Sequence, residues 1–465
     1  MTEIETAQSK TRKEVYLSAF ESFEKSADQK TPAWIHHTRK SAIDRFSNLG
    51  FPTMRDESWK YTNVSPIAEV PFKPAFDFVL QNLSLQKIKP FLFGQDHWQR
   101  LVFVNGIYSK ELSSVAVSKN GLKIRNLEPI LTSDAKLIEP YLAHYASYDR
   151  SAFTALNTAF LQDGAFIYLP EGKVAEEPIH LLFVSFPQDQ SIVTYPRTLI
   201  IAGKNSKATI IESYASLGHA KLRGGSAAIS GGDGTYFTNA VTEIVLAEGA
   251  IVDHYKIQKE SEDAFHIGTT QVHQTRDSKF SSSSISMGAS LARNNLNVAL
   301  DAEGAECELN GLYLADGKQH IDNTTLIDHS KPRGKSRQIY KGIIGGKATA
   351  VFSGKIFVHK NSKRTDAEQT NKNLLLSEEA TVDTKPQLEI LNDDVRCTHG
   401  AAVGQLNEDA IFYLKTRGID EEAARKLLSY GFANEVIESI KVEPLRAEMN
   451  RGLLLKLEKL STVRR

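Results

Sequence analysis

The sequence of 465 residues predicts a mainly β protein in which a parallel β-helix forms the core between two helical regions. Two observations carry this prediction. From Gly164 onward, short β-branched runs alternate with Gly, Asn, Asp and Ser turns, and no pattern of helical length interrupts them. Helical periodicity is found on both sides of this run. We therefore predict three domains: residues 1–162, mainly helical; residues 163–408, the β-helix core; and residues 409–465, helical.

The balance of acidic and basic residues argues against nucleic acid as a partner. Lys+Arg and Asp+Glu both number 56, so the formal net charge is zero and no broad basic surface for nucleic acid is expected. Proteins are the expected partners. Residues 1–13 alternate acids and bases without an apolar core, and no apolar run approaches the roughly 18 residues of a membrane span. We therefore expect a cytoplasmic protein.

Two helices are predicted near the N-terminus. The apolar stripe of the first, at helical spacing, consists of Tyr16, Phe20 and Phe23. In the second, Thr31 is suited to the N-cap, Pro32 to the first helical position and Gly50 to the end of the helix. Its predicted buried face consists of Ile35, Ala42, Ile43, Phe46 and Leu49. A short strand is expected at residues 101–104.

Two architectures fit the central strands, a β-sandwich and a parallel β-helix. A loose signature recurs in which a turn is followed by Ala and then a strand, as in Glu248-Gly249-Ala250, and such recurrence is typical of stacked coils. A sandwich would instead show Asn-Gly or Asp-Gly hairpins between strands. Asn310-Gly311 is present, but it lies in the middle of a strand-like run. The β-helix is therefore favoured, and helical flanks could cover its open ends.

The C-terminal region returns to helix. Asp420 is suited to the N-cap of a helix that Gly431 is expected to end. One apolar face of this helix is predicted to consist of Ala424, Leu427 and Leu428. A further helix repeats apolar residues at every fourth position: Leu445, Met449, Leu453 and Leu457. These faces require either the β-helix of the same chain, which is the simpler interpretation, or a partner.

A search for catalytic machinery within the chain finds none of the common motifs. Arg333-Gly334-Lys335-Ser336 ends like a phosphate-binding loop, but His329 occupies the position of the first Gly. The glycine cluster of residues 224–234 lacks the Rossmann spacing and is interpreted as β-helix turns. The sequence contains no GxSxG, HExxH or CxxC motif.

The most distinctive local feature is the segment of residues 393–400, which contains Cys397 and His399. In a strand these side chains project from the same face, where a thiolate and an imidazole suit zinc, ferrous iron or an iron–sulfur cluster. The pair is incomplete, because a tetrahedral site needs about four ligands. The simpler alternative is a packed thiol beside a hydrogen-bonded imidazole. Cys307 alternates with Glu306 and Glu308 and is expected inside the β-helix.

Several motifs in fixed order between residues 331 and 437 resemble the SufB/SufD family. They are residues 331–337 (KPRGKSR), 352–355 (FSGK), 366–377 (DAEQTNKNLLLS), 385–390 (KPQLEI), 393–401 (DDVRCTHGA) and 417–419 (RGI). Residues 57–62 (ESWKYT) resemble the SufD branch of that family. Members with the SufB role carry more cysteines, so the two of this chain favour the SufD branch over a SufB-like paralogue.

The resemblance implies a fold and a set of partners. The fold is a right-handed parallel β-helix between helical domains. The function is that of a non-catalytic scaffold in an iron–sulfur cluster assembly complex with SufB and the ABC-type ATPase SufC. SufB would pair through the β-helix and SufC through the C-terminal helices, at residues 420–430 and 434–440. In the absence of SufB, a homodimer is expected.

The resemblance also implies roles for particular residues. Cys397 and His399 would lie at the SufB interface and share in holding a transient iron–sulfur cluster. FADH2 is a candidate cofactor of the assembled complex. The residues predicted to bind SufC are Asp420, Ala424, Leu427, Leu428, Gly431 and Phe432. No catalytic residue is predicted.

Two competing functions remain open at this point. Parallel β-helices often belong to polysaccharide lyases or hydrolases, which place clusters of carboxylates on one sheet face. No such cluster and no signal peptide are evident here. The chain could also be a purely structural partner of SufB in which Cys397 and His399 are inert.

Overall fold

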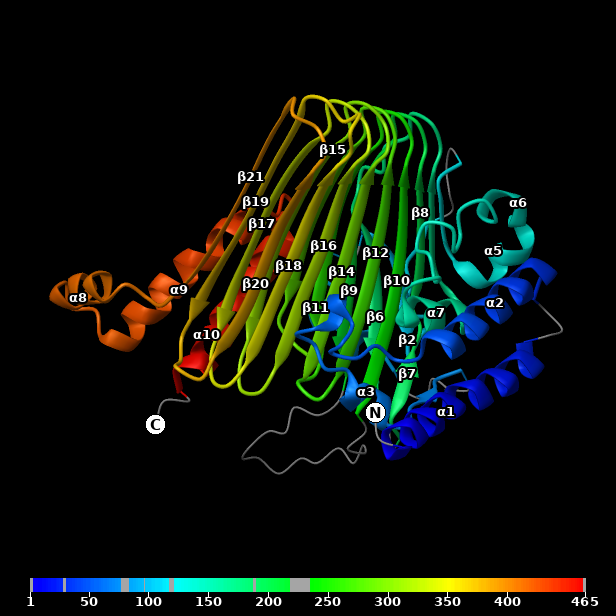
Figure 1. Ribbon diagram of the computed structural model, residues 1–465, viewed down its shortest axis with the longest axis horizontal. Coiled ribbons are helices and arrows are strands. Elements are labelled where there is room, and N and C mark those ends of the chain that lie inside the picture. The colour runs from blue at the N-terminus through cyan, green and yellow to red at the C-terminus, as the bar shows by residue number, and fades with distance from the viewer. Residues whose placement is uncertain are drawn as a thin grey trace.

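The computed structural model describes residues 3–27, 31–76, 83–95, 97–116, 121–186, 190–217 and 235–462. Its centre is a parallel β-helix built from two sheets, to which successive strands contribute alternately (Figure 1). The interpretation as a β-helix is therefore confirmed. The glycine cluster of residues 224–234 lies outside the described residues, so its interpretation stays a prediction.

The first sheet follows the order β20-β18-β16-β14-β12-β10-β8-β5-β4, with β7 and β1 beside β10. Its strands are β1 (Lys73–Pro74), β4 (Lys123–Asn126), β5 (Gly164–Leu169), β7 (Ile192–Thr194), β8 (Arg197–Ala202), β10 (Tyr236–Leu246), β12 (Phe265–Gln274), β14 (Leu291–Leu300), β16 (His320–His329), β18 (Thr349–Val358) and β20 (Thr381–Ile390).

The second sheet follows the order β21-β19-β17-β15-β13-β11-β9-β6-β2-β3. Its strands are β2 (Gln99–Val104), β3 (Ile107–Tyr108), β6 (Ile179–Ser185), β9 (Lys207–Ser216), β11 (Ile251–Lys259), β13 (Lys279–Ser286), β15 (Glu306–Ala315), β17 (Lys335–Ile344), β19 (Thr365–Leu375) and β21 (Val395–Gly404). The predicted strand at residues 101–104 is β2, which joins this sheet instead of standing apart from the β-helix.

The recurring turn-and-Ala signature precedes several strands, among them β11 and β15. Ala250 and Ala305 are fully buried, and each follows a glycine with a positive φ, 67° at Gly249 and 76° at Gly304. Only glycine adopts this conformation without a steric penalty, so the turn is tight and Ala enters the core. Asn310 and Gly311 lie inside β15, which excludes a hairpin there. Cys307 is buried among the same apolar side chains, as predicted.

Helices cover the N-terminal end of the β-helix (Figure 1). They are α1 (Glu3–Ala27), α2 (Ala33–Leu49), α3 (Ser65–Glu69), α4 (Leu85–Ile88), α5 (Leu127–Ser133), α6 (Ala135–Ile138) and α7 (Ala152–Ala159), with the 3-10 turns η1 (Glu57–Trp59) and η2 (Lys89–Phe91). The predicted stripe Tyr16, Phe20 and Phe23 is buried. Leu49 is 38% exposed, so its predicted burial is wrong, because it lies in the last turn of α2 beyond the packed face.

The C-terminal helices are α8 (Glu408–Thr416), α9 (Glu421–Glu438) and α10 (Glu443–Thr462). The predicted four-residue repeat of α10 is buried against the second sheet, so this helix docks onto its own chain. The prediction that Gly431 ends a helix is wrong, because α9 continues through it to Glu438. Burial of Ala433, Val436 and Ile437 offsets the cost of about 1 kcal/mol for a glycine inside a helix. Among the described residues, no helix is long and apolar enough to cross a membrane.

Candidate functional site

The two ends of the β-helix differ. At the N-terminal end, the sheets end in the short antiparallel strands β4 and β3, and residues of α5 and α6 pack against β5 and β8. At the C-terminal end, β20 pairs only with β18 and β21 only with β19 among the described residues. Both terminal strands therefore present a row of backbone N–H and C=O groups that another chain can pair with. We call the coil formed by β20 and β21 the terminal coil.

The terminal coil also exposes apolar side chains. Ile390, Leu391 and Val403 are 38%, 46% and 46% exposed. Unpaired strand edges together with exposed apolar side chains are typical of a protein–protein interface and not of a surface that stays in contact with water. Figure 1 shows β21 at the free end of the stack, with α8 projecting beyond it.

Cys397 and His399 lie on β21 of this coil, as the sequence predicts for a strand. The register places Cys397 beside Ala367 and His399 beside Gln369 of β19, and both of these neighbours are buried inside the β-helix. Both predicted residues therefore project on the inner side of the terminal coil. Cys397 is half-buried against the core, whereas His399 is exposed because no further coil covers it.

Burial raises the pKa of the Cys397 thiol above its ordinary value, and the Asp366 carboxylate acts in the same direction. The thiol is therefore neutral at pH 7 until a cation stabilises the thiolate. Sulfur and nitrogen donors two residues apart suit zinc or iron. In the described part of the chain no group of three or more His, Cys, Asp or Glu side chains could hold a metal. Cys397 and His399 supply two of the roughly four donors that a tetrahedral site needs.

The two cysteines are expected to react very differently with iodoacetamide. Cys397 is accessible, whereas Cys307 is 5% exposed and burial raises its thiol pKa strongly. Mass spectrometry of the native chain should find alkylation at Cys397 alone, and denaturant should release Cys307. The rate at Cys397 should rise with pH through a midpoint above the value of about 8.5 for free cysteine. Native alkylation of Cys307 would contradict the placement of both thiols.

The six residues predicted to bind the ATPase fall into three classes. Asp420 caps α9 by accepting a hydrogen bond of 2.9 Å from the Ala423 N–H. Asp420, Leu427 and Gly431 are exposed, and Leu428 and Phe432 are half-buried. Ala424 is fully buried by its own chain, so it supports α9 and presents no docking surface. Leu427 does not share the buried face of Ala424, contrary to the predicted pattern.

Other exposed apolar residues in this region were not predicted. Phe412 and Tyr413 of α8 are 69% and 58% exposed, and Leu454 and Leu455 of α10 are 42% and 55% exposed. The sequence does indicate exposed apolar residues in α8, because Ile411 to Leu414 form a continuous apolar run that one helix face cannot bury. Only Ile411 of that run is fully buried.

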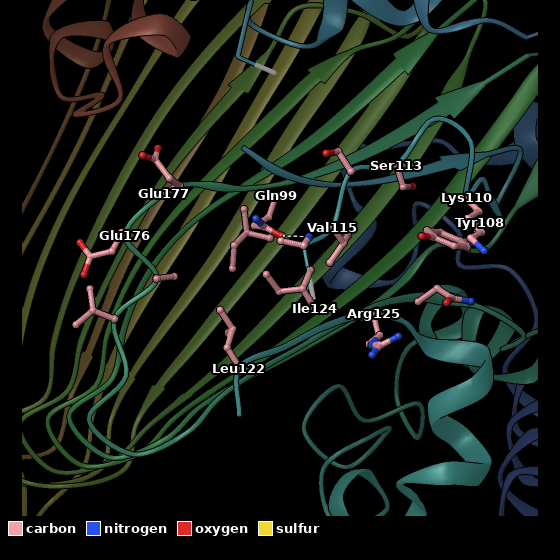
Figure 2. Close-up of a pocket in the computed structure, with 16 residues that line it drawn as sticks. Gln99, Tyr108, Lys110, Ser113, Val115, Leu122, Ile124, Arg125, Glu176 and Glu177 are labelled. Carbon is pink, nitrogen blue, oxygen red and sulfur yellow. Dashed lines mark hydrogen bonds between the residues drawn. The ribbon is translucent and has the colours of Figure 1, made fainter. Parts of the chain in front are cut away.

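A pocket of about 870 Å³ lies at the opposite end of the β-helix. Ile124 and Ile179 belong to its apolar lining. Figure 2 shows Glu176 and Glu177 on one side of it and Lys110 and Arg125 on another. Neither Cys nor His lines this pocket, and it contains none of the predicted site residues. The terminal coil therefore remains the candidate functional site.

Comparison with known proteins agrees with this geometry. The family model described as SUF system FeS cluster assembly, SufBD core domain, matches residues 185–432, and the model of the SufBD protein N-terminal region matches residues 10–181. An iron–sulfur cluster assembly SufBD family protein of Synechocystis is 33% identical over 413 residues, which cover 89% of each chain. The iron–sulfur cluster assembly protein SufD of Escherichia coli is 28% identical, with 92% and 93% of the two chains covered. SufD of Bacillus subtilis is 24% identical, with 93% and 95% covered.

Proposed function

The chain belongs to the SufBD family of iron–sulfur cluster assembly proteins, and from that premise we propose that it is a non-catalytic, cytoplasmic scaffold subunit of a SufBCD complex. The observation that carries this proposal is the open end of the β-helix. There, Cys397 and His399 lie on the inner side of a coil whose edges are unpaired within the described chain.

SufB is the proposed partner at the terminal coil. A second β-helix placed end to end with this one would pair with the edges of β20 and β21 and cover Val403 and Leu391. It would also bring its own ligands to Cys397 and His399, which supports a shared site for a nascent iron–sulfur cluster as cargo. A second copy of this chain could occupy the same edges when SufB is absent.

SufC is the proposed partner at the C-terminal helices. The candidate docking surface consists of Phe412, Tyr413, Asp420, Leu427, Leu428, Gly431 and Phe432. Part of this region is anchored to the β-helix, because the Lys341 ammonium lies 4.8 Å from the centre of the Phe432 ring and donates a hydrogen bond of 2.8 Å to the Phe432 carbonyl. Movement of a bound ATPase would therefore be transmitted to β17. The prediction that FADH2 binds the complex rests on the resemblance alone and stays a prediction.

Co-expression with the SufB and SufC of the same organism tests the proposal. Affinity purification through a tag on this chain should recover a stable three-component complex, and anaerobic absorption spectroscopy should detect a cluster in it. A chain that purifies alone in the presence of both partners would contradict the scaffold function. A stable complex whose cluster does not depend on Cys397 or His399 would favour the purely structural partner.

A further inference from the structure

The coil next to the terminal coil, formed by β18 and β19, contains a buried polar atom without a hydrogen-bond partner. Gln369 of β19 is fully buried, and its side-chain oxygen Oε1 has no hydrogen-bond partner among the described residues. Buried polar atoms are nearly always paired with protein or ordered water, so such an exception calls for an explanation. The register of the two strands places Gln369 directly beside His399.

A chain of hydrogen bonds to the preceding coils fixes the orientation of the Gln369 amide. Its Nε2 donates to Oε1 of Gln338 at 2.8 Å, and Nε2 of Gln338 donates to Oγ1 of Thr325 at 2.7 Å. With the nitrogen engaged toward the interior of the β-helix, the oxygen is the part of the amide that is left as an acceptor.

Gly354 on the facing sheet provides the space that this side chain occupies. A Cβ at Gly354 would lie 2.3 Å from Gln369 Nε2 and 2.9 Å from its Cδ. The φ of Gly354 is not in the left-handed region, so steric room and not backbone conformation requires glycine here. Gly354 and Gln369 both belong to motifs of the family resemblance, and the proposed function assigned neither of them a role.

Asn371, on the same inner face of β19, has a side-chain amide whose oxygen and nitrogen are both fully hydrogen-bonded. Asn371 accepts hydrogen bonds from Asn373 at 2.6 Å and Thr384 at 2.7 Å, and it donates to the Tyr313 hydroxyl at 3.0 Å and the Tyr340 carbonyl at 3.1 Å. The amide of Asn371 therefore accepts two hydrogen bonds and donates two. Gln369, in contrast, keeps one acceptor unused.

We propose that Gln369 is a positioning residue for His399: when a partner covers the terminal coil, the exposed imidazole turns inward and its ring N–H donates a hydrogen bond to Gln369 Oε1, which is unpaired in the isolated chain. Adjacent strands are about 4.8 Å apart, so an imidazole on one strand reaches an amide at the same register on the next. A histidine that binds a metal through one ring nitrogen uses the other as a donor, which fixes the tautomer and the direction of the ligating nitrogen. Gln369 would thus aim His399 at the shared site, an inference that rests on the proposed function for its purpose.

The first test uses NMR of labelled histidine in the full-length chain bound to the partner that covers the terminal coil. In the wild type, His399 should be found predominantly as one tautomer. Gln369→Met removes the acceptor with little change in volume and should give a mixture of both tautomers. Gly354→Ala should have the same effect while keeping Gln369, because the added methyl group displaces the amide. Gln274→Met is the matched control, since Gln274 is an equally buried glutamine on β12, distant from His399.

The second test measures the rate of cluster formation in the co-purified complex. Gln369→Met should slow it by roughly 10- to 100-fold, the usual effect of removing a partner of a metal-binding histidine, whereas Gln274→Met should leave it unchanged. An unchanged tautomer ratio or an unchanged rate in Gln369→Met would overturn the positioning role. If His399→Ala itself leaves the rate unchanged, the ligand role within the proposed function fails, and the tautomer ratio still decides whether the hydrogen bond exists.

Discussion

Glu243→Ala is expected to lower the free energy of unfolding by about 3–5 kcal/mol, which is the typical cost of breaking a buried ion pair by removing one partner. Glu243 and Arg197 are both fully buried, and their side chains lie 2.5 Å apart. The Glu243 carboxylate also accepts hydrogen bonds from the backbone N–H groups of Ala143, Tyr145 and Ala146 at 2.9 to 3.0 Å. The substitution would leave a buried guanidinium without its counter-charge and three backbone donors without their acceptor.

Chemical denaturation followed by circular dichroism measures this effect. Glu248→Ala is the matched control, because Glu248 pairs with Lys204 at 3.2 Å but both side chains are about half exposed. An exposed pair contributes about 1 kcal/mol or less, so the control should shift the transition only slightly. Equal shifts for the two variants would show that the loop of residues 143–146 is not held by Glu243.

Val403→Lys is expected to weaken binding of the proposed partner at the terminal coil by roughly 30-fold or more, which corresponds to about 2 kcal/mol. Val403 is 46% exposed and lies on the inner side of β21, in register with Asn373. A partner that covers this coil would bury the lysine ammonium without a counter-charge, whereas the isolated chain leaves it in water. The stability of the isolated chain should therefore change little.

The affinity can be measured by biolayer interferometry with immobilised partner. Val174→Lys is the matched control, because Val174 is 50% exposed and lies between β5 and β6 near the other end of the β-helix. This variant should bind like the wild type. If both lysine variants bind equally well, the partner does not dock on the terminal coil.

The β-helix could be predicted because its determinants are local. The turn-and-Ala signature at Ala250 and Ala305 recurs in several coils, and the alternation around Cys307 alone places this thiol inside. The helix α10 could also be predicted from local sequence, because Leu445 and Leu453 repeat at helical spacing, and both are fully buried.

What could not be predicted depends on contacts between distant segments. Gly431 is a helix terminator by its own propensity, but tertiary packing of the residues that follow it overrides that preference. Leu427 and Leu428 are adjacent, and sequence does not decide which of them turns toward the β-helix. The pairing of Gln369 with His399 depends on the length of an entire coil, so its register emerges only from the folded structure.

In the proposed function, the terminal coil supplies Cys397 and His399 to a cluster site that a second chain completes. Mössbauer spectroscopy of the anaerobic, iron-57-labelled complex, in the wild type and in Cys397→Ala and His399→Ala, would detect this site. Size-exclusion chromatography should show that all three complexes assemble equally. A cluster signal is expected in the wild type, and it should be lost or strongly reduced in both variants. An unchanged cluster signal in both variants, with the complex intact, would contradict it.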